Sequence, residues 1–149
     1  ITNQETTLEE INDVLNNKVL VKEKYKPRFI SFYNYTGTEL NEELANLDIS
    51  NVTSMAYMFY GCSNITTLDL SKWDTSNVTN MNSTFNSCSK LTRLDIRNFV
   101  FTKVFNARST FSSIPKDCLI IVKNETEKEW LTSRFKDMVN IKTVAELEV

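Results

Sequence analysis

The sequence contains no histidine and only two glycines, Gly37 and Gly61. The first absence removes the commonest general base and the commonest zinc ligand, and without Cys-x-x-Cys spacing no metal site is expected. The second absence excludes a glycine-rich loop of the kind that cradles phosphate groups. With so little of this chemistry available, we expect a protein that is not an enzyme and that carries no cofactor.

The chain also lacks a strong charge of either sign and a long apolar run. Its 17 basic and 19 acidic residues give a formal charge of -2, which favours neither nucleic acid nor an anionic membrane as a partner. No apolar run reaches the roughly 18 residues of a membrane span, and residues 1–5 do not resemble a signal peptide. Because the chain starts without Met, we expect a trimmed fragment that does not itself insert into a membrane, with its export signal or anchor outside it.

A repeat of 26 residues dominates what is present, because residues 43–68 align without a gap over residues 69–94. The identical pairs are Leu44/Leu70, Asp48/Asp74, Ser50/Ser76, Asn51/Asn77, Val52/Val78, Thr53/Thr79, Met55/Met81, Phe59/Phe85, Cys62/Cys88, Ser63/Ser89, Thr66/Thr92 and Leu68/Leu94. A fixed period between about 20 and 50 residues is the signature of a solenoid, in which each unit buries its apolar face against a neighbour.

Each repeat has a strand half and a second half with a different period. Ile65, Leu68 and Leu70 are spaced as on the strand side of a leucine-rich repeat. Leu68 and Leu70 are expected to point inward, because side chains alternate along a strand. Apolar residues then recur at intervals of three, four and three, which predicts a short helix beginning after the polar residues 74–77. These apolar residues are Val78, Met81, Phe85 and Cys88.

The stretch LDLSKWDTSNVTNM, followed by a Phe and a Cys-Ser pair, resembles the 26-residue repeats of bacterial surface proteins, also called BspA-like leucine-rich repeats. The match is nearly verbatim over WDTSNVTNM and covers residues 43 to about 113. The resemblance implies an α/β fold, a right-handed leucine-rich-repeat-like solenoid of parallel strands and short helices. It also implies display on, or release from, a bacterial cell and a role in adhesion or host contact. The family shows no shared catalytic residue.

We expect residues 1–149 to form a single solenoid domain with a cap at each end. Residues 1–40 are the predicted N-terminal cap, with a helix over 1–17 and a strand over 28–35. The aromatic side chains of this strand are expected to pack against that helix, the alternative being that some of them form exposed surface. Residues 41–114 hold about three repeats, the first with its strand at residues 42–45. Residues 115–149 are the predicted C-terminal cap, with a strand over 118–122, a helix beginning at Thr126 and a short strand over 138–144. This order of elements also resembles the usual C-terminal ending of the surface-repeat family.

Three cysteines are present, and two of them, Cys62 and Cys88, hold equivalent positions in successive repeats. Their bond vectors would be parallel, a geometry that suits a disulfide poorly, so we expect two buried free thiols that act as small apolar groups. Because the total is odd, at least one thiol of a monomer is unpaired, Cys118 being the third.

The outward positions of the predicted strands and of the turns after them form a small polar ribbon, which is the candidate binding face. The ribbon starts with Asn41, Glu43 and Ala45 on the first repeat. Its candidate binding residues are Thr67, Asp69, Ser71, Lys72, Arg93, Asp95, Arg97 and Asn98. Arg93 and Arg97 are the first candidates for ligand contacts, because Arg is enriched at binding hot spots. Asp69 and Asp95 are expected to be solvated surface groups about 5 Å apart and not a catalytic pair. The competing interpretation is that the whole face is simply polar and solvated.

The leading functional hypothesis is a non-enzymatic adhesion or host-interaction module at the cell surface or outside the cell, where it binds protein or glycan. A second hypothesis is a structural or antigenically variable surface spacer with no dedicated ligand. A third is an intracellular leucine-rich scaffold, which the unpaired cysteines allow. A signal peptide or lipobox upstream of this fragment would exclude the third hypothesis. Neither the ligand nor the oligomeric state follows from the sequence.

Overall fold

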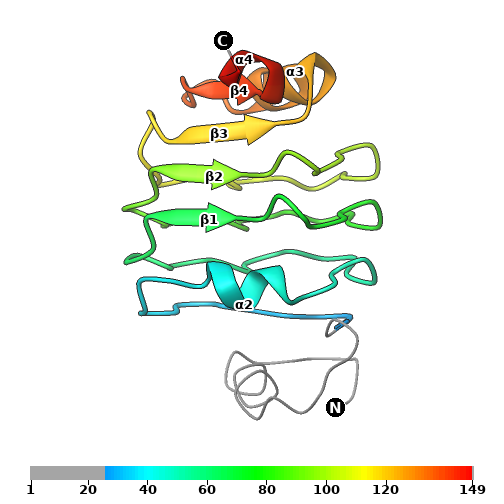
Figure 1. Ribbon diagram of the computed structural model, residues 1–149, viewed down its shortest axis with the longest axis vertical. Coiled ribbons are helices and arrows are strands. Elements are labelled where there is room, and N and C mark those ends of the chain that lie inside the picture. The colour runs from blue at the N-terminus through cyan, green and yellow to red at the C-terminus, as the bar shows by residue number, and fades with distance from the viewer. Residues whose placement is uncertain (1–25, 149) are drawn as a thin grey trace.

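The structure, a computed structural model, describes residues 26–148 and shows a mixed α/β arrangement with one parallel sheet and a few short helices (Figure 1). The sheet has four strands in the order β1-β2-β3-β4. The strands are β1 (Thr67–Asp69), β2 (Arg93–Asp95), β3 (Leu119–Val122) and β4 (Ile141–Thr143). The helices are α2 (Asn41–Ala45), α3 (Glu125–Arg134) and α4 (Val144–Leu147). The strands expected over residues 118–122 and 138–144 are therefore confirmed as β3 and β4.

The register of the sheet follows the sequence repeat. Leu68 pairs with Leu94, and Leu94 pairs with Ile120, so paired residues are 26 positions apart in both steps. Each repeat therefore lies directly on the next, with equivalent residues as neighbours. The last step is shorter, because Ile120 pairs with Ile141 after the chain has passed through α3. We refer to residues 41–66, 67–92 and 93–114 as the first, second and third repeats.

The second half of each repeat corrects one expectation, because residues 78–88 form consecutive turns and no helix. The backbone N–H groups of alternate residues donate to carbonyls of the next repeat; examples are Met81 to Asn106 at 2.7 Å and Phe85 to Thr110 at 3.0 Å. Ser83 and Ser87 have φ values of 54° and 64°, and a right-handed helix cannot pass through such residues. A second ladder of hydrogen bonds between repeats thus replaces the bonds within a helix.

The strand expected over residues 42–45 is also corrected, because this segment is the single-turn helix α2. Its Asn41 side chain occupies the edge of β1: Oδ1 accepts from the Asp69 backbone N–H at 2.8 Å and Nδ2 donates to Thr67 Oγ1 at 3.1 Å. Leu44 is fully buried, and its carbonyl accepts the Trp73 indole N–H at 3.1 Å. The helix therefore ends the sheet by satisfying its edge instead of extending it.

Two further expectations concern the predicted N-terminal cap. The helix expected over residues 1–17 lies outside the described residues. Residues 28–35 do not form the expected strand, since within them only Ile30 makes an isolated bridge. Ile30 and Phe32 are buried in the core, whereas Tyr33 is 53% exposed. Tyr33 stacks on Tyr60 with ring centroids 5.3 Å apart.

The predicted C-terminal cap contains the expected helix, but its start is corrected from Thr126. The N-cap of α3 is Asn124, whose side chain accepts from the Glu127 backbone N–H at 3.2 Å. A further helix, α4, was not predicted and begins with a capping box between Thr143 and Glu146. The polar face of the sheet ends at this cap, because Ile121 stands in register with Asp95 and is completely buried.

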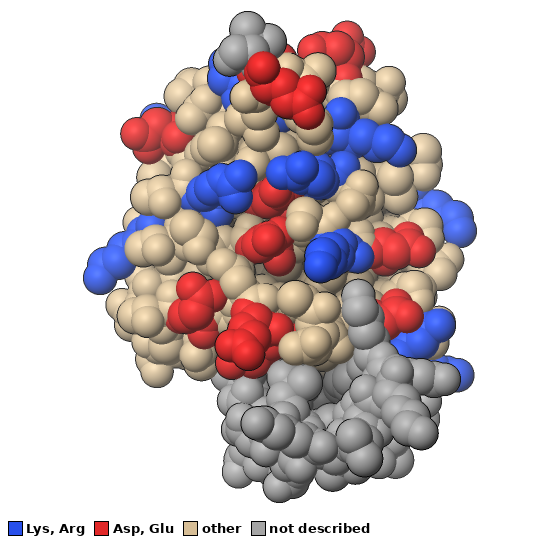
Figure 2. Space-filling model, in the orientation of Figure 1, with Lys and Arg blue, Asp and Glu red and all other residues tan. Residues whose placement is uncertain are grey.

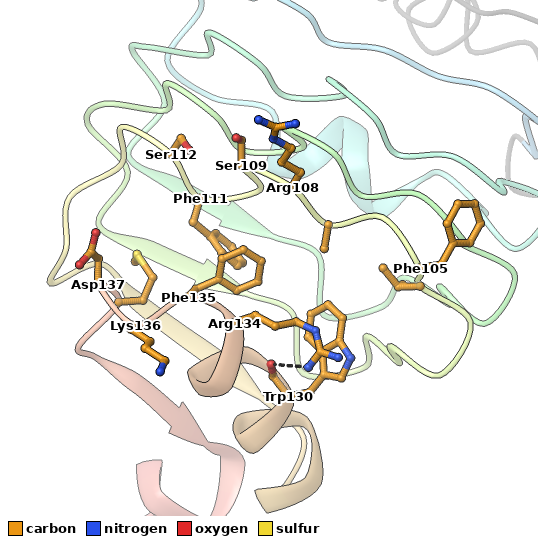
Figure 3. A pocket seen from close by; sticks show the side chains of 13 residues that line it. Phe105, Arg108, Ser109, Phe111, Ser112, Trp130, Arg134, Phe135, Lys136 and Asp137 are labelled. Carbon is orange, nitrogen blue, oxygen red and sulfur yellow. Dashed lines mark hydrogen bonds between the residues drawn. The ribbon is translucent and has the colours of Figure 1, made fainter.

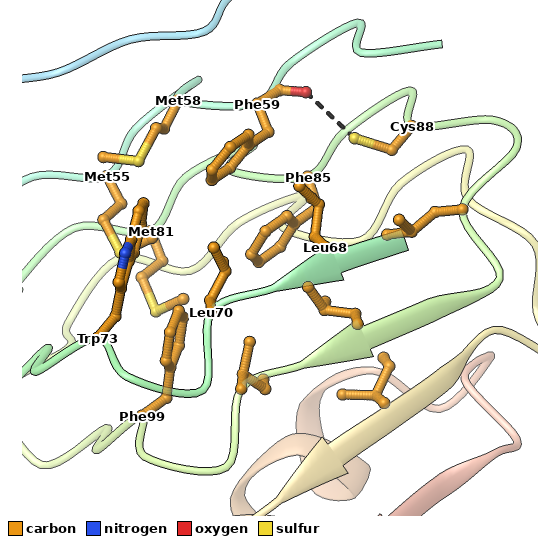
Figure 4. Close-up of a cluster of buried hydrophobic side chains, with 14 of the residues drawn as sticks. Met55, Met58, Phe59, Leu68, Leu70, Trp73, Met81, Phe85, Cys88 and Phe99 are labelled. Atoms are coloured by element: carbon orange, nitrogen blue, oxygen red, sulfur yellow. Dashed lines mark hydrogen bonds between the residues drawn. The ribbon is translucent and has the colours of Figure 1, made fainter. Parts of the chain in front are cut away.

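A single hydrophobic core runs through the stacked repeats, and part of it is shown in Figure 4. A column of phenylalanines forms its axis: Phe59 and Phe85 stack at 5.7 Å, and Phe85 and Phe111 stack at 5.8 Å. Phe32 continues the column below Phe59, and Phe135 closes it above Phe111 with its ring at 90°. Each such pair contributes about 0.5–1.5 kcal/mol beyond the burial of its surface.

Candidate functional site

The sheet brings together the eight residues of the predicted binding face. Thr67 stands beside Arg93, and Asp69 stands beside Asp95, as paired neighbours of β1 and β2. The other four follow the two strands at the same 26-residue spacing; they are Ser71, Lys72, Arg97 and Asn98. Acidic and basic side chains are interleaved on this face (Figure 2). We call these eight residues the sheet face.

Asp95 corrects the expectation of a solvated carboxylate, because the residue is only 3% exposed. The Arg97 guanidinium holds it with two nitrogens: Nε donates at 3.0 Å to Oδ1 and Nη2 donates at 2.7 Å to Oδ2. The Arg97 backbone N–H also donates to Oδ1, at 3.2 Å. The hydrogen bond to Asp95 raises the pKa of Arg97. This pair is therefore a fixed part of the fold, and it removes Arg97 from the first candidates for ligand contacts.

Asp69 stays exposed but is also held in place. The hydroxyl of Ser71 hydrogen bonds to its carboxylate, and this bond, with the nearby charges of Arg93 and Arg97, lowers the pKa of Asp69. The Ser71 backbone N–H donates to Asp69 Oδ1 at 3.0 Å. Arg93 is exposed, and no ion pair within residues 26–148 includes it. On the sheet face, Arg93 is thus a cationic group that is available to contact a ligand.

Asn98 and Lys72 lie at the end of the sheet face. The side-chain amide of Asn98 donates to the Ser71 carbonyl, so it connects the second and third repeats. Lys72 is exposed, and it takes part in none of the ion pairs found over residues 26–148. The sheet face therefore has Lys72 and Arg93 as cations that are available to a ligand. The remaining charged side chains of this face are held by hydrogen bonds or ion pairs.

A second candidate site, which the sequence did not indicate, is a groove of about 840 Å³ between the third repeat and the end of α3 (Figure 3). Its residues come from the turns of the third repeat, from α3 and from the segment after α3. They are Val104, Phe105, Ala107, Arg108, Ser109, Phe111, Ser112, Trp130, Arg134, Phe135, Lys136, Asp137 and Met138. We call this the cap groove.

The cap groove exists because the third repeat departs from the other two. Ala107 stands where they have Met55 and Met81, so a large buried side chain is missing from this layer. Phe105 stands at the position of Thr79 and is 81% exposed. Both differences, at Ala107 and Phe105, can be seen in the sequence. They indicate a binding site only when the packing of α3 beside them is known.

All three cysteines are buried and free, and for Cys62 and Cys88 this confirms the expectation. The Cys62 thiol donates to the Phe32 carbonyl at 3.2 Å, and the Cys88 thiol donates to the Phe59 carbonyl at 3.1 Å (Figure 4). The hydrogen bond with Cys62 and burial raise the pKa of the Cys88 thiol, and burial raises the pKa of Cys118 to about 12. The Cys88 and Cys118 thiols are therefore poor nucleophiles.

Within residues 26–148, His, Cys, Asp and Glu side chains do not gather in any group of three or more that could bind a metal ion. None of the helices described over the same residues has the length and apolarity needed to cross a bilayer.

The fold and the two surfaces define a mixed α/β repeat protein in which equivalent residues lie side by side across a parallel sheet. The chain belongs to the family described as "Mycoplasma protein of unknown function, DUF285", whose model matches residues 29–146. No curated protein matches the sequence. No solved structure matches it either.

Proposed function

We propose that this chain is a right-handed solenoid similar to the BspA-like leucine-rich repeats, and that it works as a non-enzymatic recognition module at the cell surface or outside the cell. The register of 26 residues in two successive steps of the sheet supports this, because it requires one turn of the chain per repeat. Crossovers between parallel strands are right-handed in nearly all proteins, which supports the handedness.

The sheet face is the proposed ligand surface, and the observation that carries the proposal is its fixed, repeated arrangement. Backbone pairing sets the positions of Thr67, Asp69 and Arg93, and side-chain bonds hold Asp69 and Asp95. Arg93 and Lys72 project from this rigid base with no ion-pair partner within residues 26–148. A ligand with carboxylate or hydroxyl acceptors, on a protein or a glycan, then binds without ordering the surface first.

A surface spacer without a dedicated ligand is the second candidate function. The observation in its favour is that the sheet face satisfies much of its own charge, because Asp95 is paired with Arg97 and Asp69 lies near both arginines. A spacer needs a soluble, stable face and no free binding groups. The two functions therefore differ in what Arg93 and Lys72 do.

A binding screen separates the two functions. The chain is applied to an array of glycans and to a panel of extracellular matrix proteins, beside the variant Lys72→Ala/Arg93→Ala. Both substitutions remove exposed side chains without an ion pair in the described residues, so the variant is expected to fold normally. Saturable binding that the variant loses supports recognition through the sheet face. Absence of binding by both folded proteins favours the spacer.

A further inference from the structure

We infer that the cap groove is a second binding site, which takes an acidic peptide segment of a partner protein with an apolar side chain at its centre. This site lies away from the sheet face, on the turn side of the third repeat, and it is independent of the proposed function of that face. Figure 3 shows Phe111 and Phe135 between Arg108 on one rim and Arg134 on the other.

The floor of the groove is apolar and is built from the end of the core. Phe111 and Phe135 meet edge to face at 4.8 Å, and Met138 lies beside them in the lining of the groove. Ala107 leaves open the volume that a methionine fills in the first two repeats. An aliphatic or aromatic side chain of a ligand is therefore the group that this floor accommodates, because its burial removes apolar surface from water.

The rim of the groove is cationic. Arg108, Arg134 and Lys136 are exposed and carry three positive charges, against the single carboxylate of Asp137. None of these three cations takes part in an ion pair within residues 26–148. Acidic side chains on both sides of an apolar one complement this arrangement, since guanidinium groups bind carboxylates through paired hydrogen bonds.

The state of Trp130 favours a peptide over a sugar. Phe101 stacks on the indole at 4.4 Å with nearly parallel planes, and the Arg134 guanidinium lies 4.2 Å from the ring centroid. Both groups lie against the indole, so its stacking surface is already occupied and is not open to a sugar. Arg134 is also fixed, since its Nη1 donates to the Trp130 carbonyl at 3.2 Å. A fixed, planar guanidinium is a preorganised site for a carboxylate.

The test uses a fluorescein-labelled peptide in which one leucine stands between two pairs of glutamates, with binding followed by fluorescence polarisation. We expect a dissociation constant of about 10–100 µM, weakened by added salt. Replacing the four glutamates by glutamine, or the leucine by glycine, is expected to weaken binding at least about tenfold. Ala107→Met fills the floor without changing charge, and it is expected to weaken binding by a similar factor.

The rim is tested by Arg108→Glu/Arg134→Glu, with Lys72→Glu/Arg93→Glu on the sheet face as a control of the same net charge. Loss of binding in the first variant and unchanged binding in the second supports the inference. Equal loss in both shows attraction to the overall charge and overturns it. The inference is also overturned if the peptide fails to bind at about 1 mM, or if only an acidic glycan binds in its place.

Discussion

At the scale of single residues, the pair formed by Asp95 and Arg97 separates a structural role from a binding role. Asp95 is almost completely buried, and its carboxylate is bonded to two nitrogens of the Arg97 guanidinium. Arg93, two residues before Asp95 on the same strand, has no such partner among the described residues. Two arginines four positions apart thus serve different purposes.

Substitution of Arg97 is expected to destabilise the fold. Arg97→Ala leaves the Asp95 carboxylate buried without its cation, and we expect the free energy of unfolding to fall by about 1–3 kcal/mol. The figure is below that of a fully buried pair because the Arg97 side chain is 37% exposed. Urea unfolding monitored by circular dichroism gives the measurement, and Arg93→Ala, expected to change stability by less than about 0.5 kcal/mol, is the control. Equal stability of the two variants would show that the buried pair contributes nothing.

The sequence could not reveal the burial of Asp95, because strand alternation correctly places it on the outward side of β2. Asp95 is buried because the Arg97 side chain lies against it, and the pattern of residue types does not predict the conformation of that side chain. Ile121 and Lys142 are further members of the same row of the sheet. The paired positions are acidic in β1 and β2 and apolar in β3. We attribute this change to the C-terminal cap, which follows β3 in place of another repeat.

At the scale of elements, the second half of the repeat shows where periodicity is ambiguous. Val78, Met81 and Phe85 are all buried, as the predicted helix required, yet they lie in consecutive turns. Intervals of three and four residues place side chains on the core side both in a helix and in a series of consecutive turns. The turns differ from a helix in the acceptors of their backbone N–H groups, because alternate N–H groups donate to carbonyls of the neighbouring repeat. A pattern read within one repeat cannot show bonds made between repeats.

The cap element α4 carries a pH dependence. Glu146 accepts a hydrogen bond from Lys128 Nζ at 2.8 Å and another from the Thr143 backbone N–H at 3.1 Å, and these bonds lower the pKa of Glu146 from 4.5 to about 2. A depressed pKa in the folded state means that the stabilisation is complete above the ordinary value. It is lost as the pH falls from 4.5 towards 2.

We therefore expect Glu146→Gln to lower Tm at about pH 6 and to have a much smaller effect near pH 2, where about half of the Glu146 carboxylates of the parent protein are protonated. Thermal unfolding followed by circular dichroism at a series of pH values measures this. The exposed residue Glu129 provides the control substitution, Glu129→Gln, in the same part of the molecule. A Tm difference for Glu146→Gln that stays constant across this pH range would exclude the proposed role of the ion pair.

At the scale of the whole molecule, the 26-residue period predicted most of the arrangement. It placed Leu68, Leu94 and the strand at residues 118–122 side by side, and the structure shows this register. The prediction succeeded because identical side chains at a fixed spacing stack best on one another. The cap groove could not be predicted, because it joins residues 104–112 to residues 130–138 and depends on how α3 packs.

The phenylalanine column gives a test of the stacked core. Phe85 is completely buried between Phe59 and Phe111, so Phe85→Ala is expected to cost about 3–5 kcal/mol of unfolding free energy. Phe105→Ala removes the same side chain from an exposed position and is expected to cost less than about 0.5 kcal/mol. Denaturant unfolding of the two variants measures both values. Similar costs at the two positions would contradict the stacking of the repeats around this column.

We propose that the stacked repeats recognise a ligand through the sheet face without chemistry. The most direct test of this proposal is the dissociation constant of a ligand found in the binding screen, measured by calorimetry for the parent chain and for Lys72→Ala/Arg93→Ala. We predict at least about a tenfold weakening in the variant, and no change in Arg108→Ala in the cap groove. Equal affinity of the parent chain and the sheet-face variant, with both proteins folded, would contradict the claim.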